Sequence, residues 1–459
     1  MTNSIPFTEQ VDEQNPFREK IRSLGFKCAV ALVFVRFSAL PEVIAFITGV
    51  NTYIIYLFGP IVILALIFSG GLRRTFQERA AKFWLCFALW MIVAVPFSSW
   101  KGGSLSDVTS YLKAYFIMLF VTAGLARTWT DCRKIIYAVA AAGVFNLTMA
   151  YLAPGGGDRL AFAWSGTIGN SDDFAAHLLL VMPFVLFIGL KPRTHFLVRL
   201  LSIGVVGLGA LQILRTASRG ALIALALTTL LLFFRGSFRQ RAAIFAASVA
   251  ILVLLVFFIP AATFQRITSF SKNDKASAEA MESSEIRRYL LEKSIEFTLR
   301  NPVFGVGPGQ FSSYEGRSVT QHGFMASWHE AHNSYTQVSS ECGIPALGFF
   351  LAALASTFVL LARIRRKAAD ADDKELAAAA YCIRMALFAF TSAVFFLNFG
   401  YCYQFPAVSG LVVCMWRVVN SESDCSRDVN TQRDVFEIQE QVPELELSNR
   451  LPHKLSTSY

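Results

Sequence analysis

Long apolar runs separated by short polar segments dominate this sequence and limit what the chain can fold into. A helix needs about 20 mostly apolar residues to cross a bilayer. We predict twelve such spans, at residues 26–48, 51–70, 82–97, 108–126, 134–152, 170–190, 196–213, 219–234, 241–260, 332–361, 377–398 and 401–418. Charged residues make up only 16% of the 459 residues, too few to cover a soluble globule of this size. The sequence therefore predicts an all-α integral membrane protein and excludes an ordinary cytosolic enzyme.

Basic residues are distributed unevenly between the two sets of alternate loops. The loops 71–82, 127–134, 191–199, 235–241 and 363–376 contain 18 Lys and Arg residues, whereas 98–107, 153–169 and 214–220 contain four. Short loops rich in Lys and Arg remain in the cytoplasm. We therefore predict cytoplasmic termini and an outer location for the second set. The net charge of +10 lies in these loops and forms no basic stripe, so no nucleic-acid partner is predicted.

The predicted organisation follows from this topology. Residues 1–25 form a cytoplasmic segment, 26–260 the first nine spans, 261–331 a long outer loop, 332–418 the last three spans, and 419–459 a disordered cytoplasmic tail. The outer loop contains a helix from Ser284, with apolar residues near 3.6-residue spacing, which Asn301 and Pro302 end. A Gly-rich turn from Gly305 to Phe311 follows. Long loops in compact proteins are usually functional.

Ionisable residues in or beside the predicted spans gather toward the outer membrane face. Such residues are costly within a bilayer and are candidates for function. The candidates are Lys113, Asp172, Asp173, His177, Arg219, His332 and Glu341 in the spans, with Arg287, Arg288, His322, His329 and Glu330 in the outer loop. Their clustering predicts an outward-facing polar cavity that handles an anionic or polar substrate.

His332 is the sharpest of these candidates. If it opens a helix, Thr336, Ser339 and Gly343 extend its face inward as a stripe of small and polar residues, while Glu341 points toward a neighbouring helix. The alternative is a helix-capping His followed by a small-residue packing face. The alternative role for Arg219 is to anchor the helix at the membrane interface. The alternative for Arg287 and Arg288 is that they lie on a solvated helix face.

Two short motifs resemble cofactor-binding sequences, but neither has the spacing or the flanking elements that such a site requires. The sequence HEAH, from His329 to His332, spaces its two His residues at i and i+3, whereas zincins use i and i+4. The sequence GVGPG, from Gly305 to Gly309, lacks the flanking strand and crossover helix of a dinucleotide site. We therefore predict no metal and no other cofactor.

At these residues the chain resembles the O-antigen ligase and O-antigen polymerase superfamily of bacterial envelope enzymes. The similar segments are HNSYTQVSSECGIPALG from His332, which includes Asn333, Glu341 and Gly343; Arg287 with Leu291 before NPVFGVGPGQF; SRGAL around Arg219; and GTIGNSDDFAAHLLLVMPF from Gly166. Together they cover roughly residues 160–350. Ligases of the family often have a Thr shortly after the motif Gly, where this chain has Ile344, Pro345 and Ala346. This departure favours a polymerase over a ligase.

The resemblance implies a fold like that of the GT-C membrane glycosyltransferases and an active site on the periplasmic face of the inner membrane. It implies transfer of a glycan from undecaprenyl pyrophosphate to a sugar hydroxyl of lipid A core or of another lipid-linked glycan. Arg219 and Arg287 would hold the pyrophosphate, because guanidinium groups match phosphate oxygens. His332 would take the acceptor's proton or orient the acceptor. Lys113, Asp172, Asp173, Asn333, Glu341 and Gly343 would support the site.

Two other classes of function remain open from the sequence. A transporter or flippase of lipid-linked oligosaccharides would also have many spans and an outer cavity, and it would be expected to have related halves and broken helices near mid-membrane. A sensor or assembly scaffold would not need two arginines and a histidine to converge. Convergence of Arg219, Arg287 and His332 in one cavity is the observation that separates these classes.

Overall fold

The computed structural model describes residues 16–155, 159–164, 166–235, 275–321 and 328–421, with six isolated positions between 238 and 249. Within these ranges the regular elements are helices, and the β-structure is limited to one isolated bridge between Pro154 and Phe162. The chain divides into two units, Met1–Trp416 and Arg417–Tyr459. Most of the predicted ninth span and nearly all of the predicted tail lie outside the described residues.

Six helices in the described ranges are long and apolar enough to cross a membrane. They are α6 (Arg79–Ala94, continued to Phe97 by η1), α9 (Trp129–Leu152), α10 (Ser171–Leu190), α11 (Phe196–Arg215), α17 (Ser334–Asp370) and α18 (Lys374–Ala393, continued to Phe396 by η3). Two shorter apolar helices are α4 (Ile54–Phe68) and α12 (Arg219–Arg235). The structure is thus that of a multi-pass membrane protein, while twelve spans and the GT-C-like fold remain predictions.

The first predicted span, 26–48, is bent into two helices. α2 (Pro16–Phe37) and α3 (Leu40–Thr48) meet at 64°, and they amount to one further span if the bent pair is counted as one. Ala39 lies between them with φ of 50°, in the left-handed region, and Pro41 follows at the start of α3. A proline has no N–H to donate to the carbonyl four residues earlier, and its ring clashes with that carbonyl, so a continuous helix across this junction is disfavoured. The single continuous helix expected for this run is therefore replaced by a bent pair.

The fourth predicted span, 108–126, is also irregular. It consists of α7 (Lys101–Ser110), the π-helix η2 (Tyr111–Phe116) and α8 (Ile117–Ala123). α8 contacts the short helix α5 (Gly71–Thr75). A π-turn within an α-helix is uncommon and shifts the side chains after it around the helix axis. Lys113 lies in this π-turn with an exposed side chain.

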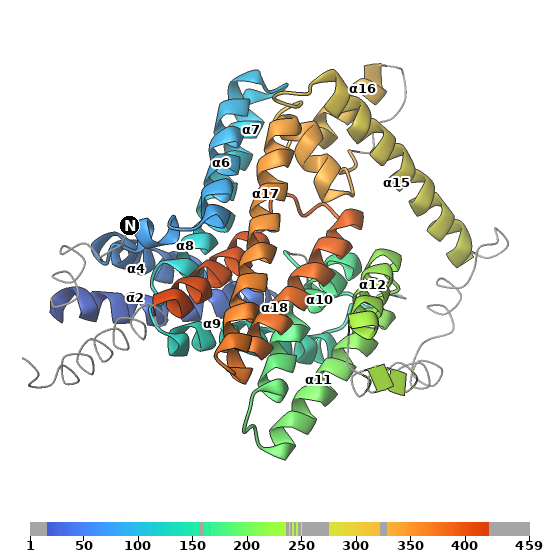
Figure 1. The fold of residues 1–459 in the computed structure, drawn as a ribbon. Coiled ribbons are helices and arrows are strands. Elements are labelled where there is room, and N and C mark those ends of the chain that lie inside the picture. Colours follow the sequence, from blue (N-terminus) through green and yellow to red (C-terminus); the bar gives the residue numbers. More distant parts are fainter. Residues whose placement is uncertain are drawn as a thin grey trace, which may run out of the picture. The chain divides into compact units, whose positions relative to one another are not determined.

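α10 and α17 form the centre of the helix packing in the first unit. α10 is the most buried of the six long helices and contacts α9, α11, α12 and α18. α17 runs beside α6 and α18, as Figure 1 shows, and their contact contains the aromatic side chains of Trp84, Phe87 and Phe350. Edge-to-face aromatic pairs of this kind add specific attraction to the burial of apolar area.

The helix predicted in the outer loop is confirmed. α15 (Lys275–Arg300) begins nine residues earlier than expected and ends directly before Asn301, as predicted. It packs on α17, and α16 (Phe311–Gln321) follows the Gly-rich turn (Figure 1). A small apolar cluster joins these parts to the segment before α17. It consists of Leu290, Phe297, Val306, Phe311 and Ala331.

α17 is broken at Gly343, and the Gly-rich turn fills the break. Gly343 has φ of 84° and ψ of 173°, and Pro345 follows it. The carbonyls of Ser340 and Glu341, freed from helical hydrogen bonding, accept from the backbone N–H groups of Val306 and Gly307 at 2.8 and 2.9 Å. A break in a membrane helix is tolerated where other groups satisfy its backbone. The turn therefore stabilises the broken helix and is itself fixed by it.

Candidate active site

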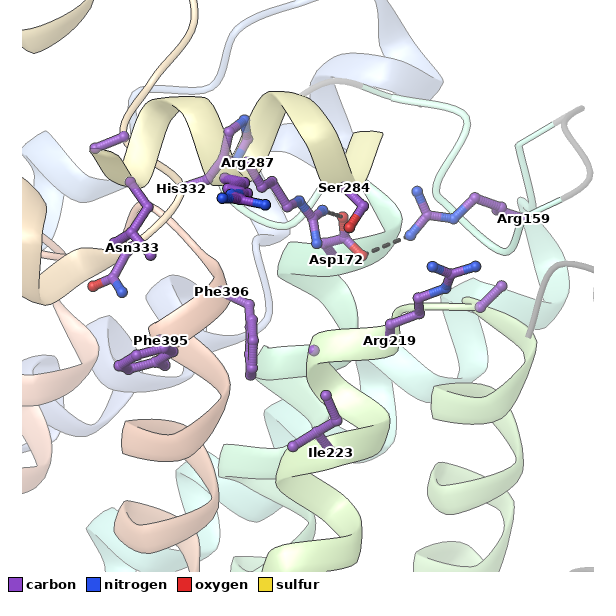
Figure 2. A pocket seen from close by; sticks show the side chains of 15 residues that line it. Arg159, Asp172, Arg219, Ile223, Ser284, Arg287, His332, Asn333, Phe395 and Phe396 are labelled. Atoms are coloured by element: carbon purple, nitrogen blue, oxygen red, sulfur yellow. Dashed lines mark hydrogen bonds and ion pairs between the residues drawn. The ribbon is translucent and has the colours of Figure 1, made fainter. Parts of the chain in front are cut away.

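A pocket of about 350 Å³ lies where α10, α12, α15 and the segment before α17 meet. Figure 2 shows its side chains. Its walls are formed by Arg159, Asp172, Ala217, Arg219, Gly220, Ile223, Ser284, Arg287, Arg288, Leu291, Ala331, His332, Asn333, Phe395 and Phe396. We call it the arginine pocket, because four arginines and one aspartate line it. The three residues that the sequence singled out, Arg219, Arg287 and His332, all lie in its wall.

Asp172 joins two of the arginines. It is the second residue of α10. Its carboxylate accepts from Arg159 Nη2 at 2.6 Å and from Arg287 Nη2 at 2.9 Å (Figure 2). Arg159 also donates from Nε to the carbonyl of Thr216 at 2.9 Å. The three charged side chains are each between 17% and 29% exposed, so the pairs are only partly screened by water. One carboxylate thus orients two guanidinium groups toward the same space.

Arg219 enters the pocket at the N-terminus of α12, which Figure 2 shows below Arg159. The preceding turn is tight: Ala217 has φ of 50°, and Ser218 Oγ accepts from Ala221 N at 3.4 Å. A side chain at Gly220 would place its Cβ 2.6 Å from Cβ of Phe396. The SRG sequence therefore combines a helix start, a cation and a close helix contact. A helix N-terminus adds a favourable field for anions.

His332 lies before α17, and this corrects the prediction that it opens the helix. Asn333 is the N-cap: its Oδ1 accepts from Tyr335 N and Thr336 N at 3.0 and 3.2 Å. His332 itself has φ of 48°, outside the helical region. The stripe drawn from His332 to Gly343 on one helix face is therefore not present, because the helix begins after the His and breaks at the Gly. The left-handed backbone instead directs His332 into the pocket wall.

The environment of His332 favours the neutral imidazole. Burial lowers the pKa of His332 below its ordinary value, and the nearby Arg287 guanidinium lowers it further, while Asp172 acts in the opposite direction. A neutral imidazole accepts a proton, whereas the imidazolium does not. Burial, together with the same arginine that suits an anionic ligand, thus favours the neutral form of this base.

The remaining predicted residues lie outside the arginine pocket or only border it. Asp173 follows Asp172 but faces a second pocket, and Lys113 is exposed on η2 and lines neither pocket. Glu341 is buried and accepts from the backbone N–H groups of Gly309 and Phe311 at 2.9 and 3.1 Å. Glu341 therefore contacts the Gly-rich turn, where a neighbouring helix was expected, and Gly343 packs against Val303 and Phe304 just before this turn.

Sequence reasoning did not single out Arg159 as a site residue. It is one of only four basic residues in the three short outer loops, and that scarcity was the available signal. Its contact with Asp172 was not foreseeable, because the segment that positions it is irregular: Leu160 N donates to the carbonyl of Arg215 at 3.1 Å. Phe395 and Phe396, which form the apolar side of the pocket, gave no signal beyond their place at the end of a span.

Among the residues that the structure describes, no three His, Cys, Asp or Glu side chains are placed to bind one metal ion. His329 and His332 lie in this part of the chain, whereas His322 falls outside it. His177, another sequence candidate, is buried between helices, where its Nε2 lies 3.0 Å from Asn146 Nδ2. It is therefore part of the helix packing and does not line the arginine pocket.

Comparison with known families assigns this region. Residues 204–351 match the family model of the O-antigen ligase. This part of the chain is therefore similar to O-antigen ligases. A comparison with curated proteins gives no match. The match confirms the resemblance to the O-antigen ligase and polymerase superfamily, and with the apolar helices it indicates a multi-pass membrane enzyme of O-antigen assembly.

The matched region contains most of the arginine pocket. Arg219, Arg287 and His332 lie within the matched residues, as do Asn333 and Gly343. Arg159 and Asp172 lie before it, so the pocket is completed by a part of the chain that the family match does not cover. The polar wall at α10 is therefore a contribution of this chain beyond the matched domain.

Proposed function

We propose that the protein is a metal-independent membrane glycosyltransferase that moves a glycan from undecaprenyl pyrophosphate to a sugar hydroxyl on the periplasmic face of the bacterial inner membrane. The acceptor is another lipid-linked glycan for a polymerase or lipid A core for a ligase. The observation that supports this proposal is the convergence of Arg159, Arg219 and Arg287 with His332 around one pocket. The pocket is both cationic and apolar, as a lipid-linked pyrophosphate requires.

The arginines suit the leaving group of such a reaction. When the acceptor oxygen bonds to the donor's anomeric carbon, the bond from that carbon to the pyrophosphate oxygen breaks, and negative charge grows on the pyrophosphate. Guanidinium groups match phosphate oxygens through paired N–H donors and stay charged at all working pH values. Cations fixed where charge develops lower the barrier without reorganisation. Asp172 supplies that fixation for Arg159 and Arg287.

His332 suits the proton transfer in the same step. The acceptor hydroxyl loses its proton as its oxygen attacks, and a neutral imidazole in the pocket wall can accept it. Phe395, Phe396 and Ile223 form an apolar side against which the first part of a polyprenyl chain can pack (Figure 2). The donor thus has a place for its charge and for its lipid.

A transporter remains the alternative to an enzyme, and α17 does contain a break of the kind that transporters use. In transporters such breaks expose backbone groups to the substrate. Here the freed carbonyls of Ser340 and Glu341 accept from the Gly-rich turn, and none of residues 340–343 lines the arginine pocket. This arrangement favours the enzyme.

The test is transfer by the purified full-length protein in liposomes that contain the lipid-linked donor and acceptor. We expect Arg287→Ala to lower turnover by roughly 10²–10³-fold, and Arg287→Lys to restore little of it. Arg300→Ala is the matched control: this arginine lies on the same helix, is 67% exposed, pairs with Glu296 and does not line the pocket. Turnover of Arg287→Ala equal to that of the control would remove the pyrophosphate assignment.

Two variants of His332 separate catalysis from orientation. We expect His332→Ala to lower turnover by roughly 10²–10⁴-fold with little change in donor binding. His332→Gln keeps a hydrogen-bonding group but not a titrating base, so a wild-type rate in that variant would rule out the base role.

Deleting the gene in its host distinguishes the two acceptors. Long lipid-linked chains with bare lipid A core indicate a ligase, and single capped repeats indicate a polymerase.

A further inference from the structure

A second pocket of about 260 Å³ adjoins the arginine pocket. The two pockets share three wall residues, Arg159, Asp172 and His332. The remaining polar wall of the second pocket comes from the start of α10 and from the segments on either side of α17 and α18. It consists of Asn170, Ser171, Asp173, Glu330 and Asn398. We call this space the carboxylate pocket.

The two pockets differ in charge. Four arginines and one aspartate line the arginine pocket, whereas three carboxylates and one arginine line the carboxylate pocket. The two consecutive residues Asp172 and Asp173 produce part of this difference, because Asp172 lies between the pockets and Asp173 lines only the second. A ligand that carries phosphate is attracted to one side of this shared wall and repelled on the other.

The carboxylates of the second pocket are held in place by amides. Asn170 Nδ2 donates to Asp173 Oδ2 at 2.5 Å, and Asn398 Nδ2 donates to Glu330 Oε2 at 2.5 Å. Each of these carboxylates accepts an amide hydrogen bond and has further lone pairs, which can accept from the hydroxyls of a polyhydroxylated ligand.

The backbone around this pocket is fixed by contacts at the start of α17. Ser334 Oγ donates to the carbonyl of Leu397 at 2.7 Å and accepts from Phe399 N at 2.8 Å. Gly400 N donates to Gln337 Oε1 at 3.0 Å. These bonds connect the segment that follows α18 to the helix that follows His332. The pocket is thus held by the same helix start that positions the imidazole.

We propose that the carboxylate pocket binds the acceptor sugar and selects a saccharide end that carries no phosphate, either neutral or amine-bearing. This inference rests on the proposed function, since it places the acceptor opposite the donor across the shared wall. An acceptor hydroxyl reaching past this wall meets His332, which takes its proton. The acceptor oxygen then bonds to the donor's anomeric carbon, the bond from that carbon to the pyrophosphate oxygen breaks, and the pyrophosphate leaves toward the arginines. Carboxylates that repel phosphate also keep the donor from binding in the wrong pocket.

The test measures binding rather than turnover. Mild acid releases oligosaccharides from the host's surface polysaccharide, and anion exchange separates phosphate-free from phosphate-bearing fractions. Saturation-transfer NMR on the purified full-length protein in nanodiscs, without donor, then compares their affinities. With the measurement made at pH 8, we expect the phosphate-free fraction to bind at least about tenfold more tightly, as two charged carboxylates beside a phosphate in a solvent-open pocket imply. Equal or tighter binding of the phosphate-bearing fraction overturns the proposal.

Variants assign the preference to the pocket. In the double variant Asp173→Asn, Glu330→Gln we expect the preference to fall below about threefold. Glu330→Gln alone is the second test, because Glu330 is exposed on an irregular segment and its change does not threaten the fold. Glu296→Gln, on the loop helix and outside both pockets, is the matched control. An unchanged preference in both pocket variants overturns the proposal.

Failure of this inference is distinguishable from failure of the proposed function. A protein that prefers phosphate-free saccharides but transfers no glycan in liposomes contradicts only the proposed reaction. A protein that transfers glycan, loses that activity in Arg287→Ala and yet binds both fractions equally contradicts only the acceptor assignment.

Discussion

Replacing Gly343 by alanine tests whether the break in α17 is required for the fold. The residue has φ of 84° and ψ of 173°, a conformation that costs a non-glycine residue about 1–3 kcal/mol. An added Cβ would lie 2.0 Å from the carbonyl oxygen of Val303 and 2.3 Å from its carbon. These are backbone atoms, so no side-chain rotation relieves the contact, and overpacking of this kind costs about 1–3 kcal/mol.

The same substitution also disturbs a hydrogen bond. Ile344 N donates to the carbonyl of Pro302 at 2.7 Å, and a shift of the turn away from the new methyl group would lengthen this bond. Its loss adds about 1 kcal/mol. The three effects together reach about 3–7 kcal/mol, a large fraction of a typical free energy of unfolding of about 5–15 kcal/mol. We therefore expect Gly343→Ala to release the Gly-rich turn from α17.

The assay is thermal unfolding of the detergent-solubilised protein, followed by transfer activity. At roughly 2 °C per kcal/mol, we expect Gly343→Ala to lower the melting temperature by at least about 5 °C and to reduce activity. Gly348→Ala is the matched control, five residues further along the same helix, where an added Cβ meets no atom within 4 Å. There alanine should be neutral or stabilise by up to about 1 kcal/mol. Equal melting temperatures and activities of the two variants would refute the reasoning.

Three further predictions concern pH, metal and topology. The pKa of His332 lies below its ordinary value of 6.5, so a neutral base persists at pH 6.5 and kcat/KM should fall only as the pH drops through that lowered pKa. Arg287→Gln removes a cation that lowers this pKa, so the acid limb of its residual activity should move to higher pH, and an unmoved limb would contradict the coupling. Transfer in liposomes should continue in excess EDTA, whereas loss that one divalent ion reverses would require a metal site. Reporter fusions at Gly316 and Asp370 should mark opposite sides of the membrane, and the same side for both would invalidate the predicted topology.

Several features of the fold were predictable because they depend on neighbouring residues. Apolar runs of about 20 residues identified the long helices, and the helix-ending pair Asn301 and Pro302 marked the end of α15. The bend in the first span and the π-turn near Lys113 were not predicted, since hydropathy records how apolar a run is but not how its helix is hydrogen-bonded. Pro41 was the one local signal of that bend.

The residues that line the arginine pocket were predictable in kind but not in arrangement. The cost of a charge within a bilayer identified Arg219 and His332 from the sequence, whereas Arg287 was identified by its place on the same outer face and by the family resemblance. Glu341 had the same signals, yet it accepts backbone N–H groups of the Gly-rich turn and does not reach the pocket. A charged side chain in a span predicts a polar partner, but it does not indicate whether that partner is a substrate or the protein's own backbone.

The sequence by itself determined the class of the protein, its apolar helices and the residue types available for chemistry, because these follow from composition and from spacing within one helix. Only the tertiary structure decided which side chains meet. Arg287 and Asp172 are 115 residues apart in the chain and 2.9 Å apart in the fold. The left-handed backbone at His332 and the break at Gly343 likewise depend on contacts with distant segments. Helical periodicity is a short-range property, whereas a pocket between four chain segments depends on how the helices cross.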